Sequence, residues 1–84
     1  MDQRFREIIA ETTGVSLESV TNDITLVRLY NDSLTIEEVL LELEQAYSLT
    51  IPEFIGANHL MPYEMRLKDL WQYINENRGD TVES

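Results

Sequence analysis

The sequence predicts an all-α fold, a small antiparallel four-helix bundle with three main helices, one short helix and a long loop between the first two main helices. Three observations predict it. Apolar residues recur at helical spacing in three segments, no segment shows the strict alternation of a strand, and 84 residues suffice for one domain with a modest core. We expect this domain over residues 1–79 and a disordered tail over residues 80–84.

The first main helix is expected over roughly residues 2–13. Phe5, Ile8 and Ile9 fall on one face of such a helix. Gly14 follows directly and supplies a stop signal. The first helix therefore offers one apolar face to the rest of the bundle.

The stretch between the first two main helices is expected to be mostly irregular. Residues 15–20 fit a single helical turn, and residues 21–23 carry side chains that bond their own backbone in turns. Residues 24–30 hold several apolar side chains without clean alternation. We interpret them as a long loop that Leu26 and Leu29 pin to the core.

The second main helix is expected over residues 33–47, where two faces differ in character. The stripe predicted to face the core comprises Ile36, Val39, Leu40, Leu43 and Tyr47. A second face holds Leu34, Glu37, Glu38 and Leu41, with Glu42 at its margin. Two leucines on that face are not needed by the core stripe, and carboxylates surround them.

The remainder of the chain predicts a connector and a final helix. Residues 54–57 suggest a short helical turn interrupted by Gly56, and residues 58–64 form a connector. The last helix is expected over residues 65–77, with Gly79 as its C-terminal cap. Its apolar stripe comprises Leu67, Leu70, Trp71 and Ile74. The expected aromatic core residues are Phe5, Tyr47 and Trp71.

The charge of the chain limits its partners. The formal net charge is −10, which argues against nucleic acid and against stable association with anionic membranes. No Lys or Arg occurs between Arg28 and Arg66, a stretch that holds Asp32, Glu37, Glu38, Glu42, Glu44, Glu53 and Glu64. Acidity that only confers solubility is the alternative. Carboxylates without local counter-ions favour a basic protein partner instead.

The sequence predicts neither a catalytic nor a metal site. Cysteine is absent, and His59 is the only histidine, expected as a solvated loop residue. No Ser/His/Asp set, carboxylate pair or metal-ligand spacing stands out. The first residues lack the order of a secretion signal, and no apolar run reaches the roughly 18 residues that span a bilayer. We therefore expect a cytoplasmic, monomeric non-enzyme.

The most distinctive motif is Asp32-Ser33-Leu34 at the start of the second helix. It is followed by the run Val39-Leu40-Leu41-Glu42-Leu43-Glu44-Gln45-Ala46-Tyr47 and then by Ile51-Pro52. Together with the length of the chain, this pattern resembles the acyl carrier proteins. Gly14-Val15 with the following residues, and Leu70-Trp71-Gln72-Tyr73-Ile74, also resemble that family. The likeness covers nearly the whole chain.

The resemblance implies a covalent 4′-phosphopantetheine arm on Ser33. A separate phosphopantetheinyl transferase, using coenzyme A and magnesium, would install the arm, and its thiol would hold acyl groups as thioesters. Asp32 is implied to help position the transferase's metal and cofactor. From the residues alone, Asp32 is equally an N-cap of the helix, and Thr35 with Glu38 offers a competing capping box.

The resemblance also implies a face for partner enzymes. Leu34 and Leu41 match its apolar positions, and Glu38 and Glu44 match carboxylates presented to basic docking patches, with Glu37 and Glu42 beside them. The partners implied are acyl-transfer, condensing or ligase enzymes of fatty acid, polyketide or related specialised biosynthesis. Because surface ion pairs contribute only about 0–1 kcal/mol each, binding should be transient and salt-sensitive.

The sequence departs from the family pattern at Tyr30, at Arg28 and in a longer connector after Pro52. These departures affect the pathway more than the modification. Tyr30 and the long connector could block the transferase, and they motivate the alternative function, an acidic helical adaptor that has the carrier fold but bears no prosthetic group.

Overall fold

The computed structural model describes residues 1–79, so the tail predicted over residues 80–84 lies outside the described residues. In chain order its elements are α1 (Gln3–Thr13), the 3₁₀ turn η1 (Leu17–Ser19), α2 (Leu26–Leu29), α3 (Ser33–Tyr47), the 3₁₀ turn η2 (Pro62–Glu64) and α4 (Leu67–Asn77). Over these residues only isolated bridges, Thr25 with Arg66 and Ile55 with Leu60, add to the helices. The all-α prediction is confirmed.

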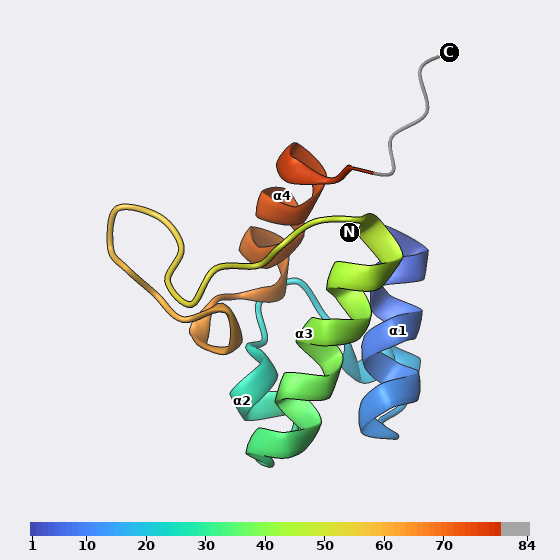
Figure 1. Cartoon of the computed structure of the whole chain (residues 1–84). Coiled ribbons are helices and arrows are strands. Elements are labelled where there is room, and N and C mark those ends of the chain that lie inside the picture. The colour runs from blue at the N-terminus through green and yellow to red at the C-terminus, as the bar shows by residue number, and fades with distance from the viewer. Residues whose placement is uncertain (80–84) are drawn as a thin grey trace.

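The helices are arranged around the long helix α3. Helices α1 and α3 pack side by side and run in opposite directions, and α4 lies on the other side of α3 from α1 in the view of Figure 1. The short α2 contacts η2 below the start of α4. The segment between α3 and η2, drawn yellow to orange, projects from the body as a loop. Helix α3 thus contributes to both the core and the outer surface.

The core comes mostly from the predicted helical stripes, together with Val20 and Leu26 from the segment between α1 and α3, whereas Leu40 of the predicted α3 stripe is half-buried and lines a groove. Its fully buried side chains are Phe5, Ile9, Val20, Leu26, Val39, Leu43, Tyr47, Leu67, Leu70 and Ile74. Trp71 is half-buried and lies 5.4 Å, between ring centroids, from each of Phe5 and Tyr47. The predicted aromatic cluster is confirmed, with Trp71 at its edge because part of its ring stays open to solvent.

The loop predicted over residues 24–30 contains helix α2, which is a correction. The Thr25 hydroxyl accepts a hydrogen bond from the backbone N–H of Arg28 at 3.3 Å and caps this single turn. Leu26 is buried and Leu29 is half-buried, so both do anchor the segment as expected. Four residues are too few for helical periodicity to be visible in a sequence.

The helical turn predicted over residues 54–57 is wrong. Ile55 and Leu60 exchange two backbone hydrogen bonds, of 2.8 and 3.2 Å, and close a hairpin-like loop. Gly56 and His59 turn the chain with φ values of 79° and 53°. Backbone with positive φ cannot continue a right-handed helix. His59 is exposed in this loop, as predicted.

The last helix begins two residues later than predicted, at Leu67. Arg66 is extended, and the backbone N–H groups of Leu67 and Lys68 donate to the carbonyl oxygens of Ile24 and Asn22, at 2.9 and 3.0 Å. The preceding loop therefore satisfies the first amides of α4, which have no partner within the helix.

Gly79 is not the C-terminal cap predicted for α4. The helix ends at Asn77, and Arg78, which follows it, is extended. Gly79 instead donates its N–H to the carbonyl oxygens of Tyr47 and Ser48, at 2.9 and 3.0 Å. A Cβ atom at this position would overlap the Ser48 carbonyl oxygen. Glycine is required here for close approach to the end of α3, not for helix capping.

Candidate modification site and docking face

Helix α3 begins with a cap formed by Asp32. The residue is extended, one carboxylate oxygen accepts from the backbone N–H of Leu34 at 3.1 Å, and the other accepts from the Thr35 hydroxyl at 3.2 Å. The Asp32 carbonyl oxygen also accepts the N–H of Ile36, at 2.9 Å. This geometry selects the Asp32 cap over the competing capping box at Thr35 and Glu38.

Ser33 is the first residue of α3 and is exposed. A helix N-terminus carries partial positive charge, which favours a phosphate attached at this position. Asp32 is exposed as well. Its carboxylate can therefore cap the helix and still be reached by another protein.

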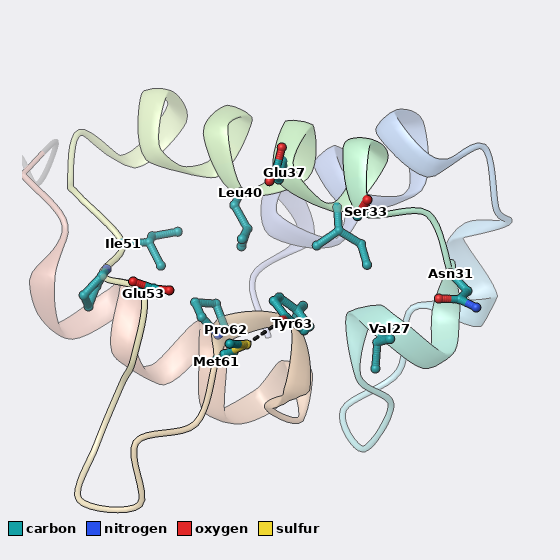
Figure 2. A pocket seen from close by; sticks show the side chains of 12 residues that line it. Val27, Asn31, Ser33, Glu37, Leu40, Ile51, Glu53, Met61, Pro62 and Tyr63 are labelled. Carbon is teal, nitrogen blue, oxygen red and sulfur yellow. Dashed lines mark hydrogen bonds between the residues drawn. The ribbon is translucent and has the colours of Figure 1, made fainter.

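Ser33 opens onto a groove between α3 and the connector. The groove has a volume of about 490 Å³ and is lined by Val27, Asn31, Ser33, Ile36, Glu37, Leu40, Ile51, Pro52, Glu53, Met61, Pro62 and Tyr63. Figure 2 shows that it extends along α3 from the end with Asn31, Val27 and Ser33 to the end with Ile51 and Glu53. Most of these side chains are apolar, so the groove suits an aliphatic group more than a hydrated one.

The wall facing α3 comes from the connector, which the sequence analysis did not assign to a site. Met61, Pro62 and Tyr63 lie opposite Leu40 and Ser33 in Figure 2. The Tyr63 hydroxyl donates a hydrogen bond to the sulfur of Met61, which holds the two side chains together. The extra length after Pro52 was the only sequence signal for this wall, and length alone does not say where a loop packs.

An attached arm fits this end of the molecule. The hydroxyl-bearing residue is exposed, it stands at a helix N-terminus, and an open groove begins beside it. Tyr30 is 37% exposed, and Ser33 is exposed beside it.

The outer face of α3 corresponds to the second helical face that the sequence predicted. Leu34 is 75% exposed and Leu41 is 50% exposed. Glu37, Glu38 and Glu42 are exposed around them. Two apolar side chains thus stand inside an acidic rim, and Glu37 borders the groove as well.

Glu44 differs from the other predicted docking residues. It is half-buried, and one carboxylate oxygen accepts the backbone N–H of Ile51 at 2.7 Å. This contact ties the segment after α3 back to the helix. Glu44 therefore has a structural role that its position in the sequence motif does not reveal, and its part in docking stays a prediction.

Two basic side chains that follow the acidic stretch in the sequence are paired with one carboxylate. Arg66 and Lys68 approach the carboxylate of Asp23 at 3.7 and 3.5 Å. Within residues 1–79, no three His, Asp or Glu side chains gather in positions that could hold a metal ion. No helix in this part of the chain is long and apolar enough to cross a membrane.

Two comparisons with known proteins agree with this geometry. A protein-family model described as a phosphopantetheine attachment site matches residues 3–53, more than half of the chain, including α1, α2 and α3. Nodulation protein F from Rhizobium leguminosarum bv. viciae is 38% identical over 74 residues, which are 88% of this chain and 66% of that protein. The chain thus matches slightly less than two thirds of that relative's length.

Proposed function

Because this chain belongs to the acyl carrier protein family, whose prosthetic group is a covalent 4′-phosphopantetheine, we propose that its arm is attached to Ser33 and carries acyl groups as thioesters. Proteins of this family are carriers and not catalysts. The chain would present its acyl groups to successive enzymes of fatty acid, polyketide or related specialised biosynthesis, as a monomer in the cytoplasm.

One observation supports Ser33 above the other hydroxyls. It is an exposed serine at the first position of a 15-residue helix, and it borders a groove of about 490 Å³ along α3. The helix dipole favours the phosphodiester that links the arm to the serine. No base in this chain is needed to activate the hydroxyl, since the transferase supplies that chemistry.

Helix α3 would also dock the partner enzymes. We assign apolar contacts to Leu34 and Leu41 and contacts with basic patches to Glu37, Glu38 and Glu42. Asp32 would guide the transferase's metal and cofactor while it caps the helix. Weak, distributed contacts suit a carrier that must leave each enzyme after its turn.

A specialised pathway is favoured over central fatty-acid synthesis. One relative is named for nodulation, and this chain places Glu37 and a long connector beside the proposed arm. Both features alter the surroundings of the arm more than the attachment site.

Modification with coenzyme A and a broad-range phosphopantetheinyl transferase tests the proposal. Intact mass should show one phosphopantetheine on the wild type and none on Ser33→Ala. Ser16→Ala is the matched control, because Ser16 also precedes a helical turn but that turn has only three residues. Wild type that stays unmodified with several transferases would refute the proposal. A partner that binds equally well to Ser33→Ala would support the adaptor function instead.

Docking through α3 has a separate test. Leu41→Ala and Glu38→Lys should each weaken binding to the transferase by several-fold, while urea unfolding stays near wild type because both side chains are exposed. Glu7→Lys on α1 reverses the same type of charge on an exposed position away from α3. If Glu7→Lys weakens binding as much as Glu38→Lys, the α3 face is not the docking site.

A further inference from the structure

We propose that the loop between α3 and η2 is a second docking surface of this protein. Residues 54–60, called the hairpin below, place Phe54 and Leu60 in an apolar pocket, rimmed by Lys or Arg, on the enzyme that also binds α3. This inference deepens the proposed function and rests on it. It gives a role to one of the departures from the family pattern, the longer connector after Pro52.

The hairpin is held in one shape by its backbone. Ile55 and Leu60 exchange the hydrogen bonds that close it, and the N–H of His59 donates to the carbonyl oxygen of Gly56 at 3.1 Å across its tip. The side chain of Ile55 is only 8% exposed and belongs to the hydrophobic core. The loop is thus anchored at its base while it projects from the body (Figure 1). A preorganised loop binds a partner at a lower cost in conformational entropy.

Two large apolar side chains stand exposed on the hairpin. Phe54 is 46% exposed and Leu60 is 42% exposed. Phe54 takes part in none of the aromatic contacts among the described residues, which join other rings. A single exposed leucine is common on protein surfaces. An aromatic ring and a leucine together on one projecting loop form an apolar anchor of the kind that fills the centre of protein interfaces.

The charge around the hairpin specifies the partner. Glu53 directly precedes Phe54, Glu64 follows in η2, and both carboxylates are exposed. No Lys or Arg occurs between Arg28 and Arg66. Charge complementarity therefore favours a basic surface around the apolar pocket. A second copy of this chain fits poorly, because it brings a net charge of −10 and the same carboxylates to the contact.

The hairpin continues the surface proposed on α3. Glu37 belongs to the docking face of α3 and also lines the groove, and Glu53 and Met61, at the two ends of the hairpin, line the same groove. Glu53 borders the end remote from Ser33 (Figure 2). The transferase needs access to Ser33 at the other end. The hairpin should therefore matter to an enzyme that processes the carried group and not to the transferase.

Kinetics on the loaded carrier test the inference. A broad-range transferase loads a butyryl arm onto wild type and onto the Phe54→Ala, Leu60→Ala double variant. The probes are the condensing enzymes of the organism that makes this chain, and the one with the highest kcat/KM for loaded wild type is used. The double variant should raise the KM of that enzyme by about five- to tenfold, with kcat within about twofold. Its loading rate and urea unfolding should stay near wild type, because both side chains are exposed.

Matched variants separate apolar contact from charge. Phe54→Leu keeps an apolar side chain and should change KM less than Phe54→Ala. Glu53→Lys should raise KM, and the effect should weaken with added salt because salt screens the attraction. Glu7→Lys, an equal change of charge at an exposed position on α1, should leave KM near wild type.

Four results would overturn the inference: an unchanged KM in the double variant, an equal loss in its loading rate, a rise in KM for Glu7→Lys as large as for Glu53→Lys, or a loaded wild type that no condensing enzyme uses. A wild-type dimer in gel filtration that the double variant loses would overturn it too, by assigning Phe54 and Leu60 to a contact between copies. A wild type that accepts no arm, read from intact mass before any enzyme is added, overturns the proposed function instead.

Discussion

Asp32 and Ser33 illustrate what single residues contribute to this protein. The motif Asp32-Ser33-Leu34 predicts Ser33 as the modification site, and this stays a prediction. From the sequence, the Asp32 cap was one of two capping arrangements for α3, and the hydrogen bonds to Leu34 and Thr35 select it. The structural role of Glu44 was missed in the sequence. Its partner is the backbone N–H of Ile51, and because nearly every residue type has a backbone N–H, the sequence does not identify this contact.

Substitution of Asp32 separates capping from recognition. Asp32→Ala removes both acceptors and should lower the free energy of unfolding by about 0.5–2 kcal/mol in urea titrations, whereas Asp32→Asn, which keeps an acceptor for Leu34, should lose only a few tenths. If Asp32→Asn folds like wild type but is modified slowly by the transferase, the charge itself serves recognition. An Asp32→Ala protein as stable as wild type would exclude the cap.

Tyr47 predicts a pH dependence of stability. Burial, and then its hydrogen bond to the Asp2 carboxylate at 2.9 Å, raise the pKa of Tyr47 well above its ordinary value of 10.0. Because unfolded tyrosine loses its proton near pH 10 while folded Tyr47 keeps it, the stabilising effect is complete below pH 10 and is lost as the pH rises above that value.

The measurement is the free energy of unfolding between pH 9 and pH 11. Wild type should show a decline above about pH 10 that is weaker in Tyr47→Phe, and Tyr73→Phe, a half-buried tyrosine on α4, should decline like wild type. An identical decline in Tyr47→Phe would show that another group is responsible.

The secondary-structure elements show where sequence patterns stop being informative. Helices α1 and α3 carry long apolar stripes and explicit ends, and their bounds were predicted to within a residue. Helix α2 is one turn long, and the loop closed by Ile55 and Leu60 depends on two residues with positive φ, one of them His59. Tertiary hydrogen bonds to Ile24 and Asn22 set the start of α4, and such contacts are invisible in local sequence.

Gly79 provides a test at the junction of α3 and α4. Gly79→Ala should destabilise the protein by about 1–3 kcal/mol, because the added Cβ meets the Ser48 carbonyl oxygen, a backbone atom that cannot rotate away. Glu76→Ala, at an exposed position of α4, is the control and should stay within about 0.5 kcal/mol of wild type in thermal or urea unfolding. Wild-type stability for Gly79→Ala would mean that the close approach does not persist in solution.

The molecule as a whole combines a small core with strong self-repulsion. A net charge of −10 on 84 residues favours rapid association with basic partners and opposes the compact state. The amino-acid composition alone was enough to predict this strong negative charge. The groove could not be predicted in the same way, because its walls come from segments that are close only after folding, α3 and the residues before and within η2.

Salt should therefore stabilise the protein. The screening length falls from about 10 Å at 0.1 M to about 3 Å at 1 M ionic strength, so NaCl over that range should raise the free energy of unfolding by about 1 kcal/mol. The Glu38→Gln and Glu42→Gln pair should respond less, since it carries two fewer like charges on α3. A stability that falls with added NaCl would show that attractive pairs, such as those at Asp23, outweigh the repulsion.

Attachment of the arm is tested most directly in protein purified from cells that produce it, by tandem mass spectrometry that preserves phosphodiester and thioester bonds. The fragment that contains Ser33 should bear 4′-phosphopantetheine, and part of the population should bear an acyl group on the arm. A bare Ser33 in every molecule, from cells in which other carrier proteins are modified, would show that this chain does not work as an acyl carrier.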